Sequence, residues 1–261
     1  MIHRINSPYS VGRINRPRVG AGWSPTDIAG CQLWLDFSDA STLFTDAGIT
    51  RVQNDGDLIY QANDKSGNGK HLTQSIEANR PKYKTGIKNG LSTGLFEATD
   101  ALDFSDTTPF DGGLDYTILI AFYINTLRNY NHLLAGDPGY FNSHTDANGA
   151  VYAGTSFVVK DRVQTNNGYL AAATYYLLDI TKNGDSAGNL SLFKNGANRV
   201  TNGTSIAPAP GESYGMYSLS RSDTNYHLDG YALEVLIYDN AVGDDNLPLL
   251  RNYINSKWAI Y

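Results

Sequence analysis

The sequence has little cysteine, little glutamate and no long apolar run. Its 261 residues include a single cysteine, Cys31, which excludes a disulfide within the chain and a zinc site built on cysteine ligands. No stretch approaches the roughly 18 apolar residues that a membrane-spanning helix needs. Charged residues make up only 18% of the chain. We therefore expect neither a disulfide scaffold nor a membrane protein.

Glycine, tyrosine and turn-forming dipeptides are abundant instead. The chain has 26 glycines and 18 tyrosines, with seven Asn-Gly and three Asp-Gly dipeptides. Both dipeptides readily adopt the positive φ angles of the tight turns that join antiparallel strands. This pattern predicts an antiparallel all-β fold of about a dozen strands, and a hydrophobic content of 41% is enough for a proper core.

Two apolar runs near opposite ends of the chain are predicted to pair, namely Gly30–Asp36 and Gly230–Tyr238. In the first run, alternation would place Cys31, Leu33, Leu35 and Phe37 on one face. Three further segments are predicted as strands: 117–124, apolar throughout and therefore central; 169–180; and the hairpin 190–194 with 197–200.

The end of the chain has a helical pattern. Leu247, Leu250, Ile254 and Trp258 recur at spacings of three, four and four residues, which predicts a helix over about 245–257 with one apolar stripe. An aspartate, Asp244 or Asp245, is expected to cap it, and Pro248 falls early, where its missing N–H matters least. Glu234 lies inside an apolar strand, so we expect it to have a structural hydrogen-bond or salt-bridge partner.

Four blocks in this order carry a resemblance: 23–36, 64–72, 230–238 and 253–258. Together they resemble the laminin-G-like branch of the concanavalin A-like lectin/glucanase superfamily, of the kind common in phage and bacterial surface proteins. The resemblance implies a two-sheet antiparallel jelly-roll sandwich over residues 23–261, with residues 1–22 as an extended arm outside it. It does not specify a function, because function on a shared fold depends on the site.

Catalysis is not expected. Glucan-cleaving relatives of this fold carry a Glu-x-Asp-x-(x)-Glu signature, which places two carboxylates on one strand face. The chain has four glutamates, and none begins that pattern. The Gly-x-Ser-x-Gly match at 211–215 follows a Pro-Ala-Pro loop, not the strand that a nucleophile elbow requires. An aspartate-only hydrolase stays open.

Sugar recognition requires aromatic faces for the C–H side of the ring and amide or carboxylate groups for its hydroxyls. The densest such mixture lies at 128–148, and a second candidate lies at 221–226. A solvated or subunit-contact loop is the plainer interpretation of the first segment, although loops often carry recognition. No cofactor is expected; calcium bound by Asp137 and Asp146 is the one candidate, but the chain lacks a calcium-loop spacing. The candidate ligand contacts are Tyr130, His132, Asp137, Tyr140, Phe141, His144, Asp146 and Asn148.

The first 22 residues are basic and contain no acid. Because their four arginines carry +4 of a net charge of −6, the rest of the chain carries −10, which argues against nucleic acid as a partner of the body. The segment lacks the apolar run of a secretory signal peptide. It is expected either to be disordered or to order against a partner through Arg4, Tyr9, Arg13, Arg16 and Arg18.

A fold that usually works outside cells, without a signal peptide or a disulfide, fits a virion component released by lysis. The sequence therefore predicts a phage structural protein, either a capsid-decoration or a fibre-like module. Residues 1–22 would tether it to other virion proteins, and it would be a homo-oligomer with a carbohydrate-adhesion role. The alternatives are a free bacterial extracellular carbohydrate-binding module and a glycan hydrolase.

Overall fold

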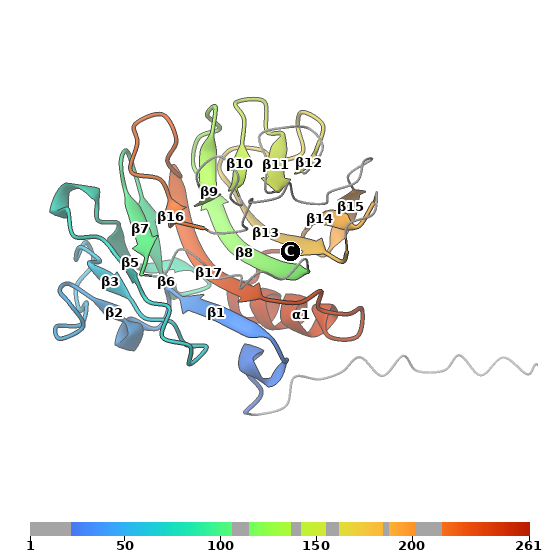
Figure 1. Cartoon of the computed structure of the whole chain (residues 1–261). Coiled ribbons are helices and arrows are strands. Elements are labelled where there is room, and N and C mark those ends of the chain that lie inside the picture. The colour runs from blue at the N-terminus through green and yellow to red at the C-terminus, as the bar shows by residue number, and fades with distance from the viewer. Residues whose placement is uncertain (1–21, 106–114, 137–141, 155–161, 185–187, 202–215) are drawn as a thin grey trace, which may run out of the picture.

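The computed structural model describes residues 22–105, 115–136, 142–154, 162–184, 188–201 and 216–261. Within them the chain forms two antiparallel sheets packed as a sandwich, with one α-helix near its end (Figure 1). The predicted fold class is confirmed. The arm residues Arg4, Tyr9, Arg13, Arg16 and Arg18 lie outside the described part. No helix in that part is long and apolar enough to cross a membrane.

The first sheet has eight strands, in the order β15-β14-β13-β8-β17-β6-β5, with β1 also pairing with β17. Together with the second sheet, the described residues hold more strands than the dozen predicted. The excess arises because several strands of the second sheet are only two to four residues long, too short to give a signal in the sequence. The strands of the first sheet are β1 (Cys31–Asp36), β5 (Lys82–Lys88), β6 (Leu91–Phe96), β8 (Tyr116–Ile124), β13 (Thr174–Lys182), β14 (Leu190–Lys194), β15 (Ala197–Thr201) and β17 (Gly230–Tyr238).

The second sheet has nine strands, in the order β12-β11-β10-β9-β16-β7-β4-β3-β2. Three short 3-10 helices, η1 (Pro25–Asp27), η2 (Ala40–Thr42) and η3 (Glu77–Asn79), lie in the connections. The strands of this sheet are β2 (Leu43–Phe44), β3 (Gln61–Ala62), β4 (Leu72–Thr73), β7 (Ala101–Phe104), β9 (Asn131–Ala135), β10 (Asn142–Thr145), β11 (Val151–Gly154), β12 (Arg162–Gln164) and β16 (Ser218–Ser220).

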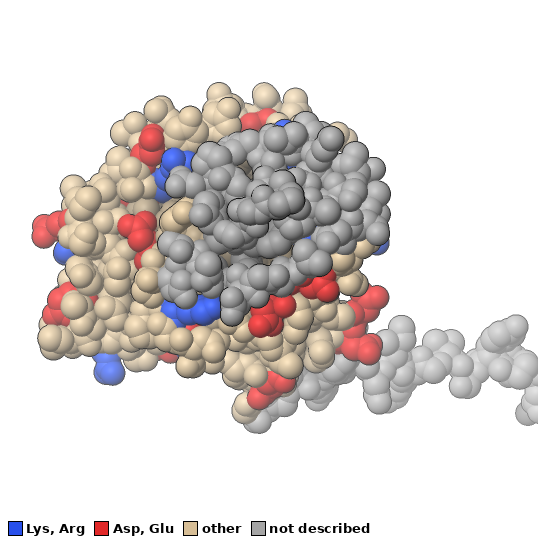
Figure 2. Space-filling view, viewed as in Figure 1, with Lys and Arg blue, Asp and Glu red and all other residues tan. Residues whose placement is uncertain are grey.

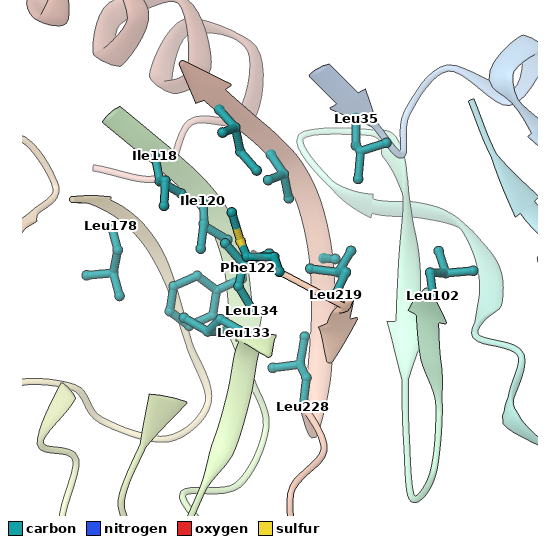
Figure 3. Packing of buried hydrophobic residues seen from close by; sticks show 14 of the residues in the cluster. Leu35, Leu102, Ile118, Ile120, Phe122, Leu133, Leu134, Leu178, Leu219 and Leu228 are labelled. Atoms are coloured by element: carbon teal, nitrogen blue, oxygen red, sulfur yellow. The ribbon is translucent and has the colours of Figure 1, made fainter. Parts of the chain in front are cut away.

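The main core lies between the two sheets. Ile118, Ile120 and Phe122 of β8 project into it, as do Leu133 and Leu134 of β9 (Figure 3). The opposite face of β8 is also buried, because its remaining apolar residues pack against the C-terminal helix α1 (Leu247–Trp258) in a second cluster. Coverage on both faces explains why β8 is apolar throughout, as its sequence predicted.

The first and last strands pair, as predicted. β1 runs antiparallel to β17, with Leu35 opposite Val235 and Asp36 opposite Glu234. β6 pairs with the opening residues of β17, so β1 and β6 pair with successive parts of that strand. Two segments about 200 residues apart in the chain therefore form one continuous part of the sheet, and its long-range hydrogen bonds hold the chain ends together.

The face of β1 predicted for Cys31 is wrong. Leu33, Leu35 and Phe37 enter the main core, but Cys31 packs against the second cluster, on the helix side. The cause is a register shift between Cys31 and Leu33, which reverses the alternation at that point. Cys31 is also only half-buried. Burial and the neighbouring Asp64 raise the pKa of its thiol to about 12, so the thiol stays protonated and unreactive.

The C-terminal helix has the predicted stripe but not the predicted cap. Leu247, Leu250, Ile254 and Trp258 are all buried against the sheet. The residue preceding the helix is Asn246, not an aspartate, and its side chain accepts no capping hydrogen bond. Pro248 in the first turn lowers the need for a cap, because it has no N–H to satisfy.

A buried ionic network joins the two chain ends. Glu234 has 0% exposure and accepts hydrogen bonds from the indoles of Trp34 at 2.8 Å and Trp258 at 2.7 Å. Lys257 Nζ lies 3.0 Å from Glu234 and 2.6 Å from Asp36. Burial alone would raise the pKa of Asp36, but Lys257 and Lys65 hold it below its ordinary value. Glu234 therefore has the expected partners, and they come from both strand β1 and helix α1.

The hairpin turn predicted at 195–196 is confirmed, whereas Asp229-Gly230 forms no turn, because Gly230 opens β17. Asn195 and Gly196 join β14 to β15 with φ angles of 54° and 70°. The strand predicted at 169–180 begins only at Thr174, because residues 169–173 form turns and Ala173 takes a positive φ.

The charged side chains on the face in view are dispersed among other residues (Figure 2).

Candidate binding surface

A row of ring-bearing side chains crosses three neighbouring strands of the nine-stranded sheet, and a glutamine continues it on the fourth. His132 of β9 is the direct partner of His144 of β10, and His144 is the partner of Tyr152 of β11. The next partner along is Gln164 of β12. Val151, Ala153 and Val163, which alternate with these residues, project into the core. The row therefore lies on the outer face of the sheet.

The rings of the row stack face to face. The centroids of His132 and His144 are 5.1 Å apart with an interplanar angle of 18°. Those of His144 and Tyr152 are 5.0 Å apart at 10°. Such spacing follows from the distance between adjacent strands, because direct cross-strand partners bring their side chains together. The three rings form one supported layer.

Two tyrosines from outside the sheet complete this layer. Tyr130, which precedes β9, lies 5.5 Å from His144 and 5.1 Å from Tyr226, measured between ring centroids. Tyr226 meets His132 edge-on at 5.8 Å. We call Tyr130, His132, His144, Tyr152 and Tyr226 the aromatic patch. Two segments chosen separately from the sequence, 128–148 and 221–226, thus come together in it.

Tyr130 is the exposed member of the aromatic patch. Its side chain keeps 44% exposure, although large apolar rings are normally covered. Its backbone has a φ of 66°, in the left-handed region that costs a bulky residue free energy. Tyr130 therefore presents its ring at the surface from a backbone conformation that costs free energy.

Arginines flank the aromatic patch on both sides. The guanidinium of Arg162 lies 4.9 Å from the ring centroid of Tyr152, and that of Arg221 lies 5.3 Å from that of Tyr226. Both contacts are within the range of cation–π attraction. The flanking arginines fix the outer rings and add hydrogen-bond donors beside the patch.

The two histidines are the buried members of the aromatic patch. His132 has 1% exposure and His144 has 6%, and Nδ1 of each has no hydrogen-bond partner among the described residues. Burial, followed by the proximity of His144, lowers the pKa of His132 to about 3. Burial, followed by Arg162, lowers the pKa of His144 to about 4. Both rings are therefore neutral at pH 7 and support Tyr130 and Tyr152 as uncharged aromatic layers.

Asp146 and Asn148 belong to a tight turn beside the aromatic patch. Asp146 Oδ1 accepts from the backbone N–H groups of Asn148 and Ala150, both at 2.9 Å. Asp146 Oδ2 accepts from the Tyr152 hydroxyl at 3.2 Å. Asp146 thus closes the turn and orients Tyr152, whereas the exposed side chain of Asn148 faces solvent.

The remaining predicted contacts, Asp137, Tyr140 and Phe141, lie outside the described residues, as does the Gly-x-Ser-x-Gly match at 211–215. Within the described part of the chain, no three His, Cys, Asp or Glu side chains are grouped to hold a metal ion. Sequence reasoning missed Tyr152, Arg162 and Gln164. The alternation of Val151, Tyr152 and Ala153 was the available signal, but it does not reveal which strands are neighbours.

Comparison with known proteins places the fold but no family. No family model and no curated protein matches the chain. Among solved structures, domain 4 of AbnA, a GH43 extracellular arabinanase from Geobacillus stearothermophilus in complex with arabinotriose, is 13% identical with a TM-score of 0.55, covering 86% of this chain and 97% of that one. A GH54 α-L-arabinofuranosidase is 12% identical with a TM-score of 0.61, covering 87% of this chain and 63% of that one.

A botulinum neurotoxin DC binding domain in complex with SialylT is a third match, 11% identical with a TM-score of 0.51. The alignment covers 88% of this chain and 52% of the neurotoxin domain, so this chain spans about half of its length. At such low identity these likenesses establish a shared β-sandwich fold. They do not transfer a ligand or an activity.

Proposed function

We propose that this chain is a non-catalytic glycan-binding module that holds sugar rings against the aromatic patch. The observation that carries the proposal is Tyr130, an exposed ring held at a positive φ over His144 and Tyr226. Aromatic faces attract the C–H side of a sugar ring, and Arg162, Arg221 and Gln164 supply hydrogen bonds to its hydroxyls. The sandwich domains that this fold resembles include one in complex with arabinotriose, which supports the same class of ligand.

A binding role is favoured over hydrolysis by the state of the carboxylates. Glycosidases need two carboxyl groups about 5–9.5 Å apart on either side of the scissile bond. The Asp146 carboxylate beside the aromatic patch is engaged in three hydrogen bonds, two to backbone N–H groups of its turn and one to the Tyr152 hydroxyl. We therefore propose that sugar release does not accompany binding.

Replacing Tyr130 and Tyr226 together with alanine should weaken glycan binding at least tenfold, because truncating an aromatic contact at the centre of a binding site typically costs about 2 kcal/mol or more. The measurement is titration calorimetry with the glycan that the wild-type chain binds best on a glycan array. Ile49→Ala is the control, since Ile49 is exposed and lies outside the aromatic patch. Unchanged affinity in the double variant, or no array binding by the wild-type chain, contradicts the proposal.

Display on a phage particle stays a prediction from the sequence. The tether in that prediction rests on the basic character of residues 1–22, which the acidic remainder of the chain does not share. A bacterial extracellular module would use the same aromatic patch without a particle. Incorporation of a chain lacking residues 1–22 into particles at the wild-type level would refute the tether.

A further inference from the structure

A polar cleft lies beside the aromatic patch, where one edge of each sheet comes together. Its volume is about 440 Å³, within the range of small-ligand sites. One wall comes from residues 164–169, which continue from β12, and the other comes from residues 194–200 of β14 and β15. The cleft is therefore built from the two edge strands, β12 and β15.

The cleft is rich in side-chain amides. Gln164, Asn166, Asn167 and Asn198 line it together with the ring of Tyr169. The four amide residues are exposed, and the Tyr169 hydroxyl is held by the backbone carbonyl of Asn198 at 2.9 Å. Amides both donate and accept hydrogen bonds, which is the capacity needed for sugar hydroxyls. The lining thus has the chemistry of a saccharide subsite.

The described lining of the cleft also holds two cations and no carboxylate. Lys194 Nζ lies 4.5 Å from the ring centroid of Tyr169 and donates to the Tyr169 carbonyl at 2.5 Å. Arg199 donates to Ser191 Oγ from two nitrogens, at 3.1 and 3.0 Å. Within the described residues neither cation forms an ion pair. Two cations with neutral partners, in a chain whose net charge is −6, favour an anionic ligand group.

One buried carboxylate, that of Asp179, lies near the two cations of the cleft. Asp179 has 0% exposure and accepts a hydrogen bond from Arg251 Nε at 2.7 Å. The guanidinium of Arg251 in helix α1 therefore balances the charge of Asp179, and Asp179 does not neutralise Lys194 or Arg199. Gln164 connects the cleft to the aromatic patch, since its Nε2 donates to the Tyr152 hydroxyl at 3.3 Å. A ligand a few sugar units long can contact both sites.

We propose that this cleft binds the carboxylate of an acidic sugar unit, with Lys194 and Arg199 contacting the carboxylate and the amides contacting the ring hydroxyls. The proposal rests on the proposed function, because the adjoining units of the same glycan lie on the aromatic patch. It adds the ligand class: an acidic glycan, such as one carrying a uronic or sialic acid.

The test is a glycan array of matched pairs, each acidic glycan printed beside its uncharged counterpart: a uronate beside its methyl ester, a sialylated chain beside the chain without sialic acid. The wild-type protein should bind acidic members at least tenfold more tightly, because hydrogen bonds to charged groups are about twice as strong as neutral ones. The double variant Lys194→Met, Arg199→Gln should lose that preference and keep its affinity for the neutral members. Lys194→Arg, which keeps the charge, should retain part of the preference.

Lys88→Met is the matched control, because Lys88 lies 4.6 Å from the ring centroid of Tyr175, outside the cleft lining. Thermal unfolding of each variant verifies that it is folded. Equal wild-type binding to acidic and neutral members overturns the acidic class and leaves the proposed function standing. Absence of any array binding overturns both, and an acidic preference that survives the double variant removes the cleft from the explanation.

Discussion

Replacing Glu234 with alanine should lower the free energy of unfolding by about 3–5 kcal/mol, the usual cost of removing one partner from a buried ion pair. In the variant, Lys257 keeps Asp36 as an ion-pair partner but loses Glu234. The indole N–H groups of Trp34 and Trp258 lose their hydrogen-bond acceptor. Urea-induced unfolding, followed by tryptophan fluorescence, measures the change. The effect is large because these groups come from β1, β17 and α1, so one substitution weakens the closure of the chain ends.

A surface glutamate provides the control. Glu97 pairs with Lys82 at 3.0 Å, and both side chains are about half exposed. Because solvent screens exposed pairs, Glu97→Ala should cost less than about 1 kcal/mol. Glu234→Gln should fall between the two, since its amide can still accept from one indole. Equal losses for Glu97→Ala and Glu234→Ala would show that the buried network does not stabilise the closure.

Acid should destabilise the protein through the two histidines of the aromatic patch. Burial keeps the pKa of His132 at about 3 and that of His144 at about 4 in the folded state, below the ordinary value of 6.5. As the pH falls below 6.5 the unfolded chain binds protons that the folded chain cannot, so stability is lost. At pH 5 the loss is on the order of 2 kcal/mol for each histidine.

Two buried aspartates act in the opposite direction. Burial raises the pKa of Asp100 and of Asp179 to about 6, so both take up protons in the folded state as the pH falls through 6, which adds stability. The contribution of the histidines is therefore measured as the difference in pH-dependent stability between the wild-type protein and a variant without them. The variant His132→Phe, His144→Phe should gain roughly 4 kcal/mol relative to wild type on moving from pH 7 to pH 5. Parallel pH profiles of the two proteins would contradict neutral buried histidines.

The sequence predicts the fold well where the signal is local. Continuous apolar runs bounded by turn residues locate β1, β8 and β17, and the Asn195-Gly196 dipeptide locates the β14–β15 hairpin. The need for a partner at Glu234 also follows from its apolar surroundings. The identity of that partner does not follow, because Lys257 and Asp36 reach Glu234 only after the first and last strands have paired.

The aromatic patch is only half visible in the sequence. Composition picks out Tyr130, His132 and His144, since they lie close together in one polar segment. Tyr152 joins them through strand register, and Tyr226 joins them because β16 lies beside β9. Register depends on which residues pack in the core, and a bulge in β1 shows how one extra residue redirects every side chain beyond it.

The most direct test of glycan binding at the aromatic patch is a nuclear magnetic resonance titration that follows the histidine ring signals. His144 contacts both Tyr130 and Tyr152, so a sugar ring against either tyrosine should shift the signals of His144. A sugar ring against Tyr226 should likewise shift the signals of His132, which Tyr226 meets edge-on. His71, whose Nδ1 accepts from the Asp64 backbone N–H elsewhere in the fold, is the internal reference. With the array-selected glycan at saturation, the signals of His132 and His144 should move while those of His71 stay. Unmoved signals from His132 and His144 under saturating glycan would contradict binding at this surface.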